Sequence, residues 1–151
     1  MEIVDFHEGF APAFKALNVA WISRYFTVVA KDLELLDDPA GKIIKAGGHI
    51  LMAVEEGEAI GCCALIALQV GGFELAKMAV TEAHKGRGVG RELMAACVER
   101  ARCVGVRRLY LETNSGLAPA LGLYRSFGFQ EVQPAEPSPY ARADVMMELL
   151  L

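Results

Sequence analysis

The sequence predicts a single α/β domain over residues 1–151, with a mixed β-sheet and helices on its faces. First, blocks of apolar residues with strand spacing alternate with blocks of helical spacing. Second, a glycine-rich loop joins a strand to a helix near the middle of the chain. Third, 151 residues suit one domain with a sizeable core. The blocks follow the order β-α-α-β-β-β-α-β-α-β-β.

The first 70 residues contain four of these elements and a short acidic helix. Residues 2–6 predict an edge strand, and apolar residues three and four positions apart predict a helix over 10–28. The acidic helical segment that follows ends near Pro39. Residues 49–55 and 59–70 then predict two strands joined by a tight turn.

The rest of the chain alternates strands and helices. The predicted strands cover 74–80, 107–113, 129–132 and 144–150, and the predicted helices cover 89–104 and 117–127. Gly105 suits the residue after a helix, because glycine readily takes the left-handed conformation needed there. Pro119 suits the first turn of the second helix.

Composition narrows the functional classes. The net charge of −4 argues against a nucleic-acid partner, which requires a basic surface. The longest nearly uncharged stretch, 59–73, is too short to span a membrane. The N-terminus has no secretory pattern, so we expect a cytoplasmic protein. The four cysteines fit no metal or redox spacing, so we expect no metal and reduced cysteines that fill apolar space.

Positive charge gathers around the central helix. Residues 82–108 hold seven Lys and Arg against three acids, a local charge of +4 that leaves −8 for the remainder. An anionic cofactor on this side of the protein would fit that distribution. For Arg100 and Arg102, a solvated helix face explains the charge equally well.

The loop before the central helix contains Gly86, Gly88 and Gly90. Glycines let the backbone bring its N–H groups close to a ligand, and a helix N-terminus adds unpaired N–H groups and partial positive charge. A phosphate or pyrophosphate suits such a loop. The spacing matches neither the Walker loop nor the dinucleotide fingerprint. A glycine-rich connection without a ligand is the alternative.

Two motifs resemble those of the GCN5-related N-acetyltransferase (GNAT) superfamily. The run Lys85-Gly-Arg-Gly-Val-Gly90 resembles its pyrophosphate loop, Q/R-x-x-G-x-G/A, although Lys85 replaces the usual Gln or Arg. The run Ala120-Leu-Gly-Leu-Tyr-Arg-Ser-Phe-Gly-Phe129 resembles its A-x-x-L-Y-x-x-x-G-F motif. The element order is also that of the superfamily, so the resemblance covers essentially the whole chain.

The resemblance implies an acetyl-CoA-dependent N-acetyltransferase that uses direct attack in a ternary complex. The loop would hold the pyrophosphate, and a backbone N–H near Met78 or Val80 would hold the oxyanion. Many members have Asn where this chain has Leu117, and whether nearby Asn114 replaces that contact is open. The implied cofactor-binding residues are Met78, Ala79, Val80, Lys85, Gly86, Arg87, Gly88, Val89, Gly90, Arg91, Asn114 and Tyr124.

The resemblance also suggests the proton-transfer groups. Tyr124 matches the tyrosine that protonates the departing thiolate, and its ordinary pKa near 10 makes that transfer feasible. Glu74 stands where histone-type members have their base, and apolar neighbours would raise its pKa. Glu112 and a chain of water molecules are the rivals for the base.

The acceptor is predicted only as a primary amine of a small molecule or peptide. The candidate acceptor-binding residues are Trp21, Tyr25, Glu112, Tyr140 and Arg142. The nearby acids, Asp32 and Glu34, would suit a cationic amine, while Arg24 and Arg142 would suit a carboxylate.

Other functions and assemblies stay open. The leading alternative is a non-catalytic module of the same fold that binds acyl-CoA to sense or regulate. The third is an interaction domain that binds no nucleotide. Apolar residues 145–151 would either pair across a homodimer or fill the sheet.

Overall fold

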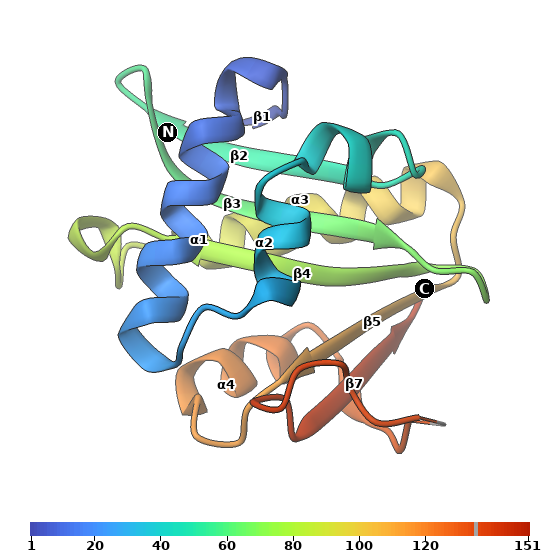
Figure 1. The fold of residues 1–151 in the computed structure, drawn as a ribbon. Coiled ribbons are helices and arrows are strands. Elements are labelled where there is room, and N and C mark those ends of the chain that lie inside the picture. Colours follow the sequence, from blue (N-terminus) through green and yellow to red (C-terminus); the bar gives the residue numbers. More distant parts are fainter. Residues whose placement is uncertain (135) are drawn as a thin grey trace.

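One seven-stranded sheet organises the computed structural model, which describes residues 1–134 and 136–151 (Figure 1). Its strands are β1 (Glu2–Asp5), β2 (His49–Glu55), β3 (Glu58–Ala67), β4 (Phe73–Val80), β5 (Arg108–Thr113), β6 (Gln130–Glu131) and β7 (Val145–Leu150). They lie in the order β1-β2-β3-β4-β5-β7-β6. Only the β4–β5 pair is parallel among the described strands. The predicted mixed sheet is therefore confirmed.

Helices cover both faces of the sheet (Figure 1). The α-helices are α1 (Ala11–Tyr25), α2 (Ala30–Leu36), α3 (Val89–Val104) and α4 (Ala118–Ser126). Side chains of α1 and α2 pack with one face of the strands, and side chains of α3 and α4 pack with the other. The alternation of a strand explains this division, because successive side chains point to opposite faces. The predicted element order is confirmed.

The helix predicted over 10–28 is wrong at its C-terminal end. Phe26 has an extended backbone (φ −145°, ψ −162°), so α1 stops at Tyr25. The buried face of α1 comprises Phe14, Leu17, Asn18 and Ile22, whereas Tyr25 is 41% exposed.

The structure also bears on the predictions for the four cysteines and for the C-terminal residues. All four cysteines are free, but Cys103 is exposed on α3, so the prediction of buried cysteines is wrong there. Strand β7 lies between β5 and β6, so residues 145–150 fill the sheet. Among the described helices, none is both long and apolar enough to cross a bilayer.

Candidate active site

A gap between β4 and β5 creates the site. The two strands pair only at Phe73 with Leu109 and at Glu74 with Tyr110. Beyond these pairs they diverge, as Figure 1 shows. A cavity of about 350 Å³ lies there and is lined by residues of β4, β5, α1, α3 and α4. Residues far apart in sequence thus share one space.

A β-bulge shapes the β4 side of the cavity. Cys62 pairs with Ala79 and Ala64 pairs with Ala76, so β4 has one residue more than β3 between these pairs. Lys77, inside the bulge, has a left-handed backbone (φ 54°), which is uncommon for a residue other than glycine. The bulge turns the backbone around Met78 out of the regular ladder, and residues 74–80 all line the cavity.

Two carboxylates lie on the α1/α2 side of the gap. Burial, then repulsion from Glu112, raises the pKa of Glu74 to about 7, with Lys77 opposing the shift. The carboxylate of Glu112 accepts hydrogen bonds from the hydroxyls of Tyr110 (2.9 Å) and Ser138 (2.5 Å). Among the described residues, no side chain donates a hydrogen bond to Glu74. Glu74 is also not on an edge strand, because β4 is the fourth of seven.

A buried ion cluster lies beside these carboxylates. Asp32, which is 0% exposed, accepts hydrogen bonds from Lys77 Nζ (2.7 Å) and from both terminal nitrogens of Arg142 (3.0 and 2.5 Å). Lys77 and Arg142 line the cavity, and Tyr140 lies against both. Lys77 was not among the predicted site residues. A lysine within the otherwise apolar residues 75–80 was the signal that could have found it.

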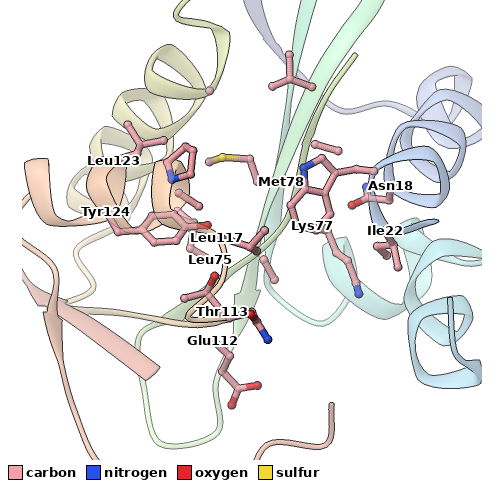
Figure 2. Close-up of a pocket in the computed structure, with 18 of the residues that line it drawn as sticks. Asn18, Ile22, Leu75, Lys77, Met78, Glu112, Thr113, Leu117, Leu123 and Tyr124 are labelled. Atoms are coloured by element: carbon pink, nitrogen blue, oxygen red, sulfur yellow. The ribbon is translucent and has the colours of Figure 1, made fainter. Parts of the chain in front are cut away.

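Tyr124 occupies the opposite side of the gap. Figure 2 shows Tyr124 and Leu123, from α4, across the cavity from Asn18 and Ile22, from α1. Burial raises the pKa of Tyr124 to about 12, and a hydrogen bond with Thr113 opposes the shift. The hydroxyl is therefore protonated at neutral pH.

The glycine loop forms the mouth of the cavity at the start of α3. Gly86 (φ 76°) and Gly88 (φ 80°) have left-handed backbones, and a Cβ atom at either would meet no atom within 4 Å. The lining residues from this region are Met78, Ala79, Val80, His84, Lys85, Gly86, Gly88, Val89 and Gly90. This open cradle, beside the N-terminus of a 16-residue helix, fits a diphosphate group.

The other predicted cationic residues of the loop point elsewhere. Arg87 lies 3.8 Å from Glu55, and Arg91 donates to Ser126 on α4 (3.3 Å). Neither lines the cavity. The structure therefore brings Lys85 and the glycines to the cavity but not these two arginines.

Asn114 and Leu117 both line the cavity. The side-chain amide of Asn114 donates to the carbonyl of Arg142 (2.7 Å) and accepts from the N–H of Gly116 (2.8 Å). Both ends of the amide thus already bind the protein. Leu117 offers an apolar wall where many GNAT members have Asn.

The predicted acceptor residues divide into two groups. Trp21, Glu112, Tyr140 and Arg142 line the cavity. Tyr25 does not, and its ring instead lies 4.9 Å from the ammonium of Lys85.

Comparisons with known proteins agree with this geometry. The Acetyltransferase (GNAT) family model matches residues 13–129. The uncharacterized N-acetyltransferase YjgM of Escherichia coli is 33% identical over 102 residues, covering 65% of this chain and 61% of YjgM. A Bacillus subtilis protein named as a [ribosomal protein bS18]-alanine N-acetyltransferase is 30% identical over 97 residues, covering 64% of this chain and 59% of that protein. The chain thus spans about three fifths of these relatives.

Solved structures share the fold over the whole chain. A GNAT-family acetyltransferase from Staphylococcus aureus Mu50 has a TM-score of 0.88 at 16% identity, with 99% of this chain and 98% of that chain covered. The structure of yncA from Salmonella typhimurium, which contains its cofactor acetyl-CoA, has a TM-score of 0.78 at 20% identity, covering 99% and 93%.

Proposed function

Because the chain belongs to the acetyltransferase (GNAT) family, we propose that it is an acetyl-CoA-dependent N-acetyltransferase acting as a single domain. Its acceptor is a primary amine of a small molecule or peptide, which attacks directly in a ternary complex. A cytoplasmic location and a homodimer stay predictions.

One observation carries the proposal: a single cavity touches Glu74 on one face of the sheet and Tyr124 on the other. A base and an acid on opposite sides of a gap suit a reaction in which one group loses a proton and another gains one. The open glycine loop lies at the same cavity and supports coenzyme A as the second ligand.

Different residues of the chain have different roles in the reaction. Acetyl-CoA supplies an activated acetyl thioester. Glu74 accepts the proton of the attacking amine, and its raised pKa, about 7, suits a base at neutral pH. Tyr124 enters the reaction protonated and donates its proton to the departing sulfur. A backbone N–H near Met78 or Val80 stabilises the negative charge on the carbonyl oxygen.

Glu74 is a better base than its rival. The hydroxyls of Tyr110 and Ser138 donate hydrogen bonds to the two carboxylate oxygens of Glu112, one to each. Glu74 lacks such donors among the described residues, so it is free to accept a proton from an amine. The cofactor side comprises Met78, Ala79, Val80, Lys85, Gly86, Gly88, Val89 and Gly90, together with Asn114 and Tyr124, whereas Arg87 and Arg91 lie outside the cavity lining.

A calorimetric titration tests this function. The protein is titrated with acetyl-CoA and with desulfo-CoA, and a panel of amines is then scored for release of free thiol. Binding together with release is the expected result. Binding without release on every amine would favour the acyl-CoA sensor, and failure to bind either ligand would exclude both functions.

A further inference from the structure

The acceptor side of the cavity contains charges of both signs, on separate walls. Lys77 and Arg142 contribute the positive wall, and Glu74 and Glu112 contribute the negative wall. All four residues line the same cavity, and Figure 2 shows Lys77 and Glu112 there. An acceptor that carries only an amine would use only one of these walls.

The positive wall has more charge than its internal partner neutralises. Lys77 and Arg142 share a single carboxylate, that of Asp32, so the three groups together carry +1. Asp32 is fully buried and does not line the cavity, whereas Arg142 does, with its side chain 21% exposed. A ligand in the cavity therefore meets the cations and not the carboxylate behind them.

The cations retain donors for a ligand. A guanidinium has five N–H donors, and two of those of Arg142 are directed at Asp32. An ammonium has three, and Lys77 directs one at Asp32 and a longer one, 3.4 Å, at the hydroxyl of Tyr140. The ring of Tyr140 holds both cations in place, 4.8 Å from Lys77 Nζ and 4.7 Å from Arg142 Cζ.

The two walls are close enough to influence each other. Glu74 and Lys77 each shift the pKa of the other, and Glu74 also affects the pKa of Tyr140, although burial is the largest cause at all three residues. Because all four residues line one cavity of about 350 Å³, a small molecule with an ammonium and a carboxylate can contact both walls.

We propose that the acceptor is a free amino acid or a related small amino carboxylate, with its carboxylate on Lys77 and Arg142 and its amine at Glu74. This inference rests on the proposed N-acetyltransferase function. In the transfer, the ammonium first loses a proton to solvent, and the free amine attacks the thioester carbonyl to form the N–C bond. A second amine proton passes to Glu74, the C–S bond breaks, and Tyr124 protonates the departing sulfur; proton exchange with solvent then restores both side chains. The products are an N-acetyl amino acid and coenzyme A.

Matched acceptors test the proposal. Each amino acid is compared with its amide, with its decarboxylated amine and with a peptide that begins with the same residue, by release of free thiol. The free amino acid should have the highest kcat/KM, about 100-fold above its amide and amine, because those analogues leave the excess positive charge of Lys77 and Arg142 uncompensated. Equal or faster reaction of the amide, amine or peptide would overturn the inference and leave the transferase function intact.

Two arginine variants test whether Arg142 is responsible for the preference for the amino acid over its amide. Arg142→Gln should reduce the ratio of kcat/KM between amino acid and amide at least tenfold, chiefly through KM for the amino acid. The ratio is taken within one protein, so a partial loss of folded protein cancels. Arg24→Gln is the matched control, because Arg24 pairs with Glu82 outside this cavity, and its ratio should stay at the wild-type value. An unchanged ratio in Arg142→Gln contradicts the proposal.

Fluorescence separates this inference from the proposed reaction. Trp21 is the only tryptophan and lines the cavity, so its emission reports a bound acceptor without turnover. With desulfo-CoA present, amino acids should give a saturable change that their amides and amines do not give at equal concentration. Absence of this change overturns the inference, whereas its presence without thiol release would contradict only the transferase function.

Discussion

The ammonium of Lys77, on β4, lies 2.7 Å from the carboxylate of Asp32, on α2, although 45 positions separate them in the chain. The contact joins a buried carboxylate to the residue whose left-handed backbone forms the β4 bulge. A non-glycine residue holds this backbone conformation only where its surroundings impose it. Asp32 therefore helps to maintain the strand that lines the cavity.

Replacing Asp32 with Asn should destabilise the fold. The change leaves Lys77 and Arg142 side by side without their buried partner, at a cost of about 3 kcal/mol in the free energy of unfolding. Urea denaturation at pH 7 measures it. Glu34→Gln is the control on the same helix, because among the described residues Glu34 forms only an exposed pair with Lys31 (3.7 Å). This substitution should cost less than about 0.5 kcal/mol.

The free energies of unfolding of the wild type and of Asp32→Asn should depend differently on pH. Burial raises the pKa of Asp32, but hydrogen bonds from Arg142, Lys77 and the Val29 N–H outweigh it and hold the pKa well below 3.8. A lowered pKa means that the carboxylate stabilises the fold above pH 3.8 and loses this effect as the pH falls further. The advantage of wild type over Asp32→Asn should shrink in that acidic range, and a constant difference would contradict the assignment.

Glu74→Gln should remove a pH-dependent step from catalysis. With a pKa of about 7, Glu74 becomes a base as the pH rises through neutrality, so kcat/KM of the wild type should increase there. The variant should lose about 100-fold in kcat/KM and the rise near pH 7. Two acceptors with different amine pKa values separate this rise from titration of the acceptor.

Glu112→Gln is the control for that profile. Glu112 helps to raise the pKa of Glu74, so its removal should keep the rise in kcat/KM but move it to lower pH. If Glu112→Gln abolished the rise and Glu74→Gln kept it, Glu112 would be the base.

Gly88→Ala should weaken acetyl-CoA binding. Its left-handed backbone (φ 80°) costs alanine about 1 kcal/mol of stability, although the free protein has space for the methyl group. A methyl group in the cradle would also displace a phosphate from the backbone donors, and one such hydrogen bond is worth roughly 1.5–3 kcal/mol. Calorimetry should show an affinity about 10- to 100-fold lower.

Gly105→Ala is the matched control at the other end of α3. Gly105 has the same kind of backbone (φ 94°) and the same open surroundings, so the stability cost should be alike. Its affinity for acetyl-CoA should equal that of wild type. Equal weakening by both variants would mean that the loop acts only through stability.

Tyr124→Phe should lower kcat by about 100-fold while the affinity for acetyl-CoA stays near that of wild type. The ring remains, and its edge contact with Phe129 (6.2 Å between centroids) is retained, so only the hydroxyl is lost. Stopped-assay thiol release and calorimetry measure the two quantities. An unchanged kcat would assign proton delivery to another group.

Local patterns in the sequence were sufficient for the element order. Helical and strand periodicity, the glycine after α3 and the proline at the start of α4 each act within a few residues, and the structure has all the predicted elements. The pattern did not predict that α1 ends at Tyr25, because the extended backbone of Phe26 carries no short-range signal. Tyr25, the last residue of α1, lies outside the cavity, whereas Phe26 lines it.

The sequence by itself determined the elements and their order, and it predicted an anion-binding glycine loop, because periodicity and backbone freedom are properties of neighbouring residues. Only the tertiary structure decided how β4 and β5 separate, that Lys77 forms a bulge, and that Asp32 meets Arg142 across 110 positions. These features depend on strand register and on long-range charge pairing. They also determine that Glu112 accepts hydrogen bonds from two hydroxyls, whereas no described side chain donates one to Glu74.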